Sequence, residues 1–226
     1  DSGRYRSLIR SLRYLTSTRP DIMLSVGITS RFMEDPSNTH WKALKRILRY
    51  VPGTLSLGLF YSKLDDYRLV GYSDSDWCGD VDDWKSTSGY VFLLRNMAFT
   101  WLSKKQPIVT LSNCEAEYVA ASLSVCHAIW LSNLLRHMGV IRDEGIVIRV
   151  DNKSAIELAK NPVNHGRSKH IDVRFHFIRE QIKKRKVELE HVESRAQAAD
   201  VFTKPLPITL LENCKRLIRM RDGKSI

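Results

Sequence analysis

Four acidic residues have the types and order that could do chemistry together. Asp74, Glu117, Asp151 and Asp200 occur in the order Asp, Glu, Asp, Asp, at the ends of predicted strands and helices. Carboxylates that converge on one point are what two hard divalent cations need, and a paired-cation site is one way in which proteins cut phosphodiester bonds. The order therefore predicts a metal-dependent nuclease.

The local pattern indicates how these side chains would be positioned. Asp74 alternates with Tyr72 along one face of a predicted strand, and Asp151 ends a strand that should lie beside it. Glu115 and Glu117 lie in the first turns of a predicted helix and point to different sides, so only one of them can face the sheet. Asp76 shares the face of Asp74 and is its rival, and spacing alone leaves both choices open.

The first 54 residues are predicted to be helical. Apolar residues recur at helical spacing in three stretches, the second of which opens at Pro20. Ser37, Asn38 or Thr39 can cap the third helix, and the Pro52-Gly53 pair ends it.

After Gly53 the apolar period changes. Stretches rich in β-branched, aromatic and leucine residues predict an antiparallel meander, and strands then alternate with helices. We expect an α/β fold with helices around one mixed sheet. The predicted strands are 55–62, 67–74, 88–94, 99–103, 146–150 and 187–192, and the predicted helices are 113–138, 154–160, 171–183 and one from Gln197 onward.

Composition favours a nucleic-acid partner. The chain carries a net charge of +11, and residues 1–60 contribute 10 − 4 = +6 of it. This basic segment is either a helical arm near a phosphate backbone or a set of helices that pack on the next domain and expose their basic side. No apolar run approaches the ~20 residues needed to span a bilayer, so no membrane partner is expected. The 4 cysteines are scattered, which favours free thiols over a zinc knuckle or a disulfide framework.

Several motifs together match a known family pattern. The motifs are Gly71-Tyr-Ser-Asp-Ser-Asp-Trp77, Ser86-Thr-Ser-Gly-Tyr90, Trp101-Leu-Ser-Lys-Lys-Gln106, Glu115-Ala-Glu-Tyr118, Asp151-Asn152, Lys169-His-Ile-Asp172, Ala199-Asp-Val-Phe-Thr-Lys204, Thr18-Arg-Pro-Asp-Ile22 and Leu48-Arg-Tyr-Val-Pro-Gly-Thr54. The first seven resemble the ribonuclease H domain of copia-type retrotransposon polyproteins, and the segment with the last two is similar to the thumb and connection that end that family's reverse transcriptase. The resemblance implies helical residues 1–54, a ribonuclease H-like domain at 55–208 with a mixed five-stranded sheet flanked by helices, and a basic tail or helix at 209–226.

The resemblance also implies roles for single residues. Asp74 is similar to the first-strand aspartate that bridges both metals, Glu117 to the helix glutamate, and Asp151 to the aspartate that ends the fourth strand. Asp200 is similar to the last-helix aspartate, and His191 to the loop histidine that helps product leave. The implied cofactors are two Mg²⁺ ions, with Mn²⁺ as a substitute, and the implied substrate is the RNA strand of an RNA/DNA hybrid. The expected substrate contacts are Ser112, Asn113, Asn152, Arg167 and Lys169.

One part of the family pattern is missing. A polymerase needs palm aspartates, typically in a Tyr-x-Asp-Asp hairpin, and this chain has no such segment. We expect the palm and fingers, and the natural N-terminus, to lie upstream of Asp1. The expected location is the cytoplasm, within a virus-like particle, or the nucleus.

Two other functions stay open. Arg10-Ser-Leu-Arg13 and Arg46-Ile-Leu-Arg49 match the Arg-x-Leu-Arg pattern of secreted oomycete effectors, which would place the protein in a host cell. The other function is that of a catalytically silent remnant, which binds hybrid with strong salt dependence and leaves the RNA whole.

Overall fold

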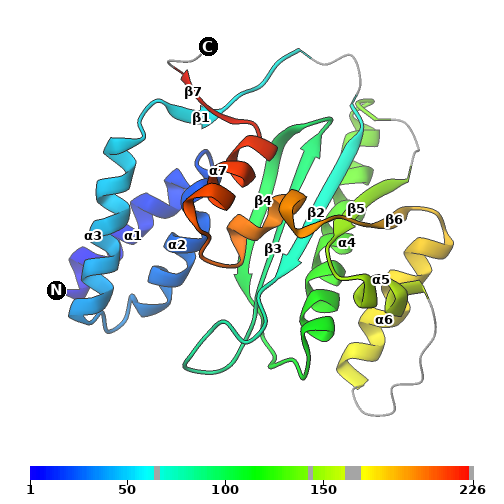
Figure 1. Ribbon diagram of the computed structural model, residues 1–226, viewed down its shortest axis with the longest axis horizontal. Coiled ribbons are helices and arrows are strands. Elements are labelled where there is room, and N and C mark those ends of the chain that lie inside the picture. The colour runs from blue at the N-terminus through cyan, green and yellow to red at the C-terminus, as the bar shows by residue number, and fades with distance from the viewer. Residues whose placement is uncertain (64–66, 142–144, 161–168, 224–226) are drawn as a thin grey trace.

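The computed structural model describes residues 1–63, 67–141, 145–160 and 169–223, with only the backbone described at 169–175. A helical segment forms the first quarter of the chain, and the rest is built around a central sheet (Figure 1). The two parts pack against each other along β4 (Met97–Lys105): Trp101 Nε1 donates to Thr16 O at 3.0 Å, and α2 (Met23–Thr29) contacts the strand.

The helical segment matches its prediction. Ser37 accepts a hydrogen bond from His40 N and caps the third helix, which ends at Gly53. A small core of its own holds the helices together, with Tyr5 and Leu44 fully buried in it. The elements are α1 Ser2–Leu15, the 3₁₀ helix η1 Pro20–Ile22, α2, the 3₁₀ helix η2 Ser30–Phe32 and α3 Asn38–Gly53.

The expected mixed five-stranded sheet is confirmed. Its strand order is β4-β3-β2-β5-β6, in which β2, β3 and β4 pair antiparallel while β5 and β6 run parallel to β2. Asp74 lies opposite Gly89 in the β2–β3 register. The remaining strands are β2 Leu69–Ser75, β3 Thr87–Leu94, β5 Ile146–Val150 and β6 Val187–His191.

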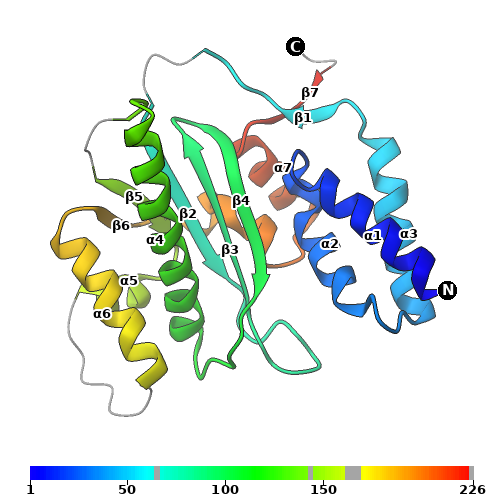
Figure 2. The same cartoon turned by 180° about the vertical axis from the view of Figure 1, so that it is seen from behind.

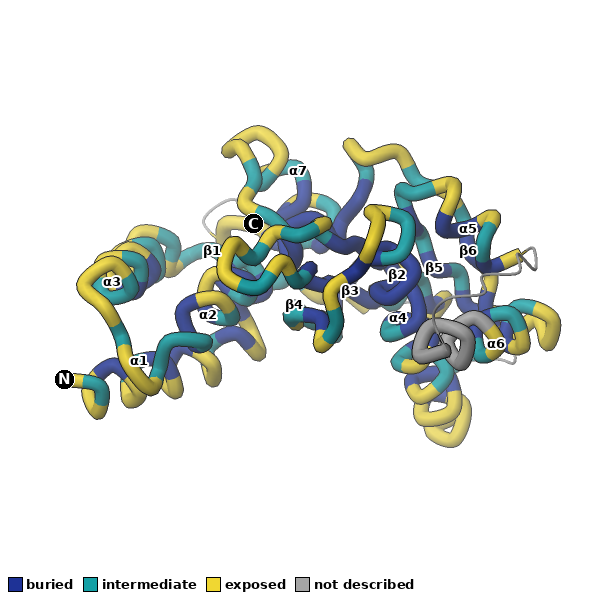
Figure 3. Tube along the Cα trace, turned by 90° about the horizontal axis from the view of Figure 1, so that it is seen from below, coloured by how far each residue is buried: buried dark blue, intermediate teal, exposed yellow. Residues whose placement is uncertain are grey.

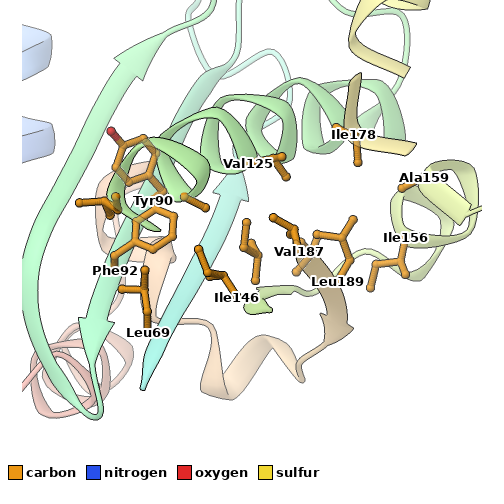
Figure 4. Close-up of a cluster of buried hydrophobic side chains, with 14 of the residues drawn as sticks. Leu69, Tyr90, Phe92, Val125, Ile146, Ile156, Ala159, Ile178, Val187 and Leu189 are labelled. Atoms are coloured by element: carbon orange, nitrogen blue, oxygen red, sulfur yellow. The ribbon is translucent and has the colours of Figure 1, made fainter. Parts of the chain in front are cut away.

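The two faces of this sheet are covered differently. The α4 face lies under the long helix α4 (Asn113–His137), and its core includes the side chains of Tyr90, Phe92 and Ile146 (Figures 2 and 4). Helices α5 (Lys153–Lys160) and α6 (Lys169–Lys183) pack beside α4. In the described part of the chain, α4 is the one helix long and apolar enough to cross a membrane, and most of that stretch is buried in this core.

The opposite side, the η4 face, is covered by shorter pieces. The 3₁₀ helix η4 (Ala198–Phe202) lies across β2 and β3, and α7 (Ile208–Leu217) packs on η4. Figure 3 shows α7 on the opposite side of the sheet from α4. A further 3₁₀ turn, η3 (Ser194–Ala196), leads into η4. Their core includes Val91, Phe202 and Ile218, all fully buried.

Two predictions about secondary structure are wrong. The stretch 55–62 does not join the meander: β1 (Leu57–Leu59) pairs antiparallel with β7 (Met220–Asp222) in a separate two-stranded sheet, where both pack on the core of the η4 face. The expected helix from Gln197 is instead the short η4. Pro205 and Pro207, which lack the backbone N–H, separate it from α7. The domain boundaries at 54 and 208 stay predictions.

Candidate active site

Strands β2 and β5 run side by side in the sheet (Figure 1), with Asp74 near the carboxyl end of β2 and Asp151 directly after β5. A cleft of about 500 Å³ opens there, and its lining includes Trp77, Asn113, Glu117, Asp151, Asn152 and Lys204. Because β2 and β5 are parallel, their ends meet at the same edge of the sheet and bring together residues far apart in the sequence.

Asp74 is completely buried on the η4 face. Thr203 Oγ1 donates a hydrogen bond to its Oδ2, and Lys204 Nζ lies 3.4 Å from the same oxygen. Both partners follow directly after η4, so the position of this 3₁₀ helix decides what Asp74 contacts.

Gly89 permits that close approach. A Cβ atom at this position would lie 2.7 Å from both Phe202 Cβ and Thr203 Cγ2, too close for any side chain without movement. Since Gly89 is the partner of Asp74 in the sheet, its missing side chain lets η4 lie directly over Asp74.

Glu117 reaches the same point from the α4 face. Ser112 caps α4 by accepting from Glu115 N at 3.2 Å, which fixes the first turn. Glu117 Oε1 accepts from Ser75 N at 3.3 Å, and Oε2 is buried with no hydrogen-bond partner among the residues the structure describes. Glu115 instead turns back to accept from Leu111 N at 2.6 Å, so Glu117 is the one that faces the sheet.

Asp151 completes a compact group. It follows β5 directly and accepts a hydrogen bond from Ser194 Oγ at 3.2 Å. One carboxylate oxygen from each of Asp74, Glu117 and Asp151 lies within 4.8 Å of the other two. We call these three residues the carboxylate triad.

Asp200 lies outside the triad. It sits on η4, a 3₁₀ helix, where the sequence predicted an α-helix. Its Oδ1 lies 2.9 Å from Lys204 Nζ, and that ammonium also faces Asp74. The structure therefore brings three of the four predicted acids together directly and joins the fourth to them through a lysine.

Burial and mutual repulsion dominate the electrostatics of these acids. Burial, with repulsion from Asp74 and Asp151, raises the pKa of Glu117 far above its ordinary value. Burial and the charge of Asp74 likewise raise the pKa of Asp151 and of Asp200, partly offset by Lys204. Burial lowers the pKa of Lys204, but the surrounding carboxylates outweigh this and raise it overall. In the described part of the chain, the site thus gathers four carboxyl groups around a single lysine, Lys204.

Asp76, the rival of Asp74, also lines the cleft, but its carboxylate has a different partner. Its carboxylate accepts a hydrogen bond from Thr87 N, and it does not belong to the triad. Burial raises the pKa of Asp76 to about 6, the Thr87 hydrogen bond opposes the rise, and repulsion from Asp74 adds to it. The geometry favours Asp74 as the first-strand ligand.

The predicted substrate contacts lie in different places. Asn113 and Asn152 line the cleft, and Asn152 also accepts from Ala155 N at 3.0 Å. Ser112 is exposed at the start of α4. His191 is exposed at the end of β6, paired in register with Val150 next to Asp151. Arg167 and the side chain of Lys169 lie outside the described residues.

Sequence reasoning assigned no role to several residues that shape the site. Gln106 is buried and donates to Ser88 Oγ at 2.9 Å and to Ala116 O at 3.0 Å, which ties the sheet to the turn of α4 before Glu117. Thr203 and Lys204 contact Asp74. Gln106, Thr203 and Lys204 fall inside motifs that carried the family resemblance, so that resemblance was the available signal. For Ser194 the sequence offers none.

The triad fits a divalent cation. Carboxylate oxygens are the hard ligands that Mg²⁺ and Mn²⁺ prefer. Glu117 Oε2, buried without a partner in the described chain, is a ligand atom that a cation would satisfy.

Several curated proteins are similar to this chain in sequence. It is 41% identical over 218 residues to the retrovirus-related Pol polyprotein from transposon RE2 of Arabidopsis thaliana, covering 96% of the chain and 15% of the relative. It is 42% identical over 220 residues to that from transposon TNT 1-94 of Nicotiana tabacum, covering 97% of the chain and 16% of the relative. A secreted RxLR effector protein of Plasmopara viticola is 47% identical over 129 residues, covering 57% of the chain and 91% of the relative. The chain matches no protein-family model.

Two solved structures align with this chain. A foamy viral protease-reverse transcriptase in complex with double-stranded DNA aligns with a TM-score of 0.56 at 11% identity, covering 85% of this chain and 38% of that one. A ribonuclease H1 in complex with an RNA/DNA hybrid aligns with a TM-score of 0.43 at 16% identity, covering 60% and 94%. At these identities the likeness concerns the fold alone. The sequence matches establish the family: this chain, which spans about 15% of the length of the Pol polyproteins it matches, belongs to the family of copia-type retrotransposon Pol polyproteins.

Proposed function

We propose that this chain is a metal-dependent endonuclease of the ribonuclease H type, which hydrolyses the RNA strand of RNA/DNA hybrids. The observation that carries the proposal is the convergence of Asp74, Glu117 and Asp151 at one edge of the sheet. Membership of the Pol polyprotein family and the matching motifs support the same activity. The proposed cofactors are two Mg²⁺ ions, with Mn²⁺ as a substitute.

The chain's own residues would prepare the site for this reaction. Asp74, Glu117 and Asp151 would hold the cation, with Asp200 completing the acid set from the η4 face. Bound divalent cations supply Lewis-acid chemistry, in which they polarise the phosphate and lower the pKa of a water nucleophile. Ser75 N orients Glu117, Ser194 orients Asp151 and Thr203 orients Asp74, so each carboxylate is held before substrate arrives.

The cleft supports a polynucleotide substrate. Asn113 and Asn152 line the cleft together with Glu117 and Asp151 and would donate hydrogen bonds to the sugar or phosphate groups. RNA is distinguished from DNA through its 2′-hydroxyls across a wide, shallow minor groove, so selectivity would come from shape and sugar contacts. The net charge of +11 would supply the sequence-independent attraction.

In a longer polyprotein, the missing polymerase palm and fingers would be the partner of the helical segment. Action within a cytoplasmic virus-like particle or in the nucleus stays a prediction.

The test is cleavage of an RNA/DNA hybrid labelled on each strand, by the purified chain, in Mg²⁺ and in Mn²⁺. Double-stranded DNA and double-stranded RNA serve as substrate controls, and Asp151→Asn serves as the protein control. We expect cutting of the RNA strand alone, lost in the variant. Hybrid binding without cutting in either metal would reject the nuclease and favour the silent binding remnant.

An effector role is the second candidate, because a relative named as a secreted RxLR effector covers over half of the chain. The structure gives the Arg-x-Leu-Arg pattern another explanation. Leu12 of Arg10-Ser-Leu-Arg13 is 4% exposed and belongs to the helical core, while both arginines face solvent. The pattern is what an amphipathic basic helix produces, so we place the nuclease first. A signal peptide encoded upstream in the full reading frame would favour the effector.

A further inference from the structure

The most unusual contact in the site is a lysine held between two of the four acids. Lys204 Nζ lies 2.9 Å from Asp200 Oδ1, 3.4 Å from Asp74 Oδ2 and 3.5 Å from Asp74 Oδ1. The Asp74 side chain is fully buried and that of Asp200 is 9% exposed, whereas the Lys204 side chain is 37% exposed at the cleft. An ammonium therefore sits where Asp74 and Asp200 could otherwise share a cation.

The triad differs from this pair in its counter-charge. Glu117 Oε2 and Asp200 Oδ1 both lack a hydrogen-bond partner in the described part of the chain, but Asp200 Oδ1 forms an ion pair with Lys204, whereas Glu117 and Asp151 form no ion pair there. At Asp74 and Asp200 the protein already supplies the positive charge, through the side chain of Lys204, four residues beyond Asp200. Glu117 and Asp151 are therefore open to an external cation, whereas Asp200 and Asp74, which also belongs to the triad, already face the Lys204 ammonium.

We propose that Lys204 is a built-in cation that occupies the second-cation position between Asp74 and Asp200. The triad then takes one divalent cation, and the Asp74–Asp200 pair takes another only when the ammonium withdraws toward solvent. Lys204 is thus a positioning residue that sets how many ions the site holds. This inference rests on the proposed function for its relevance to catalysis, but it concerns cation binding alone.

The geometry allows such a withdrawal. The Lys204 side chain lies at the mouth of a cleft on a flexible four-carbon stem, so the head group can move into solvent while the stem stays in place. Thr203, by contrast, is buried and would keep its hydrogen bond to Asp74. The exchange needs only one side chain to move, and the fold stays unchanged.

The experiment counts bound ions without any nucleic acid. Mn²⁺ is titrated into the purified chain and followed by electron paramagnetic resonance, in the wild type and in Lys204→Gln, Lys204→Arg and Lys153→Gln. Lys153→Gln is the matched control, because Lys153 lines the same cleft. We expect one strong ion in the wild type and in the control, and a second ion whose affinity in Lys204→Gln rises at least about tenfold, as loss of a neighbouring charge predicts. Lys204→Arg keeps the charge and should behave as the wild type.

A melting-temperature measurement tests whether the Lys204→Gln variant is folded. Without metal, Lys204→Gln should melt at a lower temperature than the wild type, and Mn²⁺ should raise its melting temperature more than that of the wild type. Two equally strong ions in the wild type, or the same ion count and affinities in Lys204→Gln, would overturn the inference. Ion binding as expected but no hybrid cleavage would reject the proposed nuclease and leave the role of Lys204 standing.

Discussion

The two faces of the central sheet are covered by very different structures, yet both contribute to the same site. On the α4 face a single 25-residue helix crosses the sheet and carries Glu117 in its second turn. The η4 face is covered by several short elements: the five-residue 3₁₀ helix η4, α7, the helical segment and a two-stranded sheet. Asp74 points to the η4 face and Glu117 approaches from the α4 face, so their carboxylates meet only at the edge of the sheet.

Each face fixes its part of the site in its own way. The α4 face relies on regular structure, because a capped helix places Glu117 by its period alone. The η4 face relies on close contact, because η4 must press against Gly89 before Thr203 and Lys204 can reach Asp74. The arrangement on the α4 face tolerates changes around it, whereas that on the η4 face depends on the absence of a side chain at Gly89.

Removing the carboxylate that the α4 face contributes should have the greatest effect on activity. Glu117→Gln should lower hybrid cleavage at least about 10³-fold, as loss of a central catalytic group does. Glu115→Gln, the same change two residues earlier, should leave cleavage nearly unchanged. Without metal, Glu117→Gln should also melt at a higher temperature than the wild type, because it removes a buried carboxylate that Asp74 and Asp151 repel. Equal cleavage by the two variants would contradict the assignment.

The close contact on the η4 face is tested by filling the space at Gly89. Gly89→Ala places a methyl group against Phe202 and Thr203, and it should lower the free energy of unfolding by about 1–3 kcal/mol, as overpacking does. Cleavage should fall with it, since η4 carries the partners of Asp74. Gly58→Ala is the control, because nothing lies within 4 Å of an added Cβ there. Denaturant unfolding of both variants measures the difference, and an unchanged Gly89→Ala would show that η4 has room to move.

A weaker effect is expected at the junction between the helical segment and the sheet. Asp80 pairs with Arg31 of η2 and with Lys105 at the end of β4, each at 2.7 Å. Asp80→Asn should lower the free energy of unfolding by about 1–2 kcal/mol at pH 7, because charge-assisted hydrogen bonds are lost. Asp82→Asn, an exposed neighbour, is the control.

The pH dependence at this junction has a definite sign. Burial raises the pKa of Asp80, but the hydrogen bonds and charge of Lys105 outweigh it and lower the pKa overall. A carboxyl group with a lowered pKa stabilises the folded state above the unfolded pKa of ~4, and this contribution is lost as the pH falls through the folded value. The difference between the wild type and Asp80→Asn should therefore be full at pH 7 and shrink below pH ~4. A difference that stays constant down to pH 2 would contradict the ion-pair explanation.

The least change in cleavage is expected for Asp76→Asn. Comparing it with Asp74→Asn decides which of the two aspartates is the metal ligand. Asp76→Asn should change cleavage by less than about tenfold, because its carboxylate bonds to Thr87 N and not to the triad. Asp74→Asn should lower cleavage as far as Glu117→Gln does. The reverse order would make Asp76 the ligand and move the site toward the loop after β2.

The sequence predicts the α4 face better than the η4 face, for physical reasons. Periodicity and capping residues are local signals, so α4 and β5 begin where they were expected, and the order of strands and helices predicts the mixed sheet. The pairing of β1 with β7 joins residues more than 160 positions apart, and no local signal announces it. Likewise, the close approach of Phe202 and Thr203 to Gly89 is a tertiary contact that no local signal announces.

The sequence indicates candidate residues for the site, but it does not indicate their contacts. The order of the acids and the motifs around them indicate Asp74, Glu117, Asp151 and Asp200. The position of Lys204 between two of these acids depends on a side-chain conformation four residues after Asp200, which periodicity does not encode.

The claim that the two faces of the sheet build one metal centre is best tested by locating a bound divalent cation. Crystals of the wild-type chain soaked in Mn²⁺ would show the ion by its anomalous scattering. We expect a strong peak enclosed by Asp74, Glu117 and Asp151, with Lys204 still between Asp74 and Asp200. No peak at the triad, or a peak coordinated by Asp76 in place of Asp74, would contradict the claim that the two faces of the sheet jointly build a metal centre.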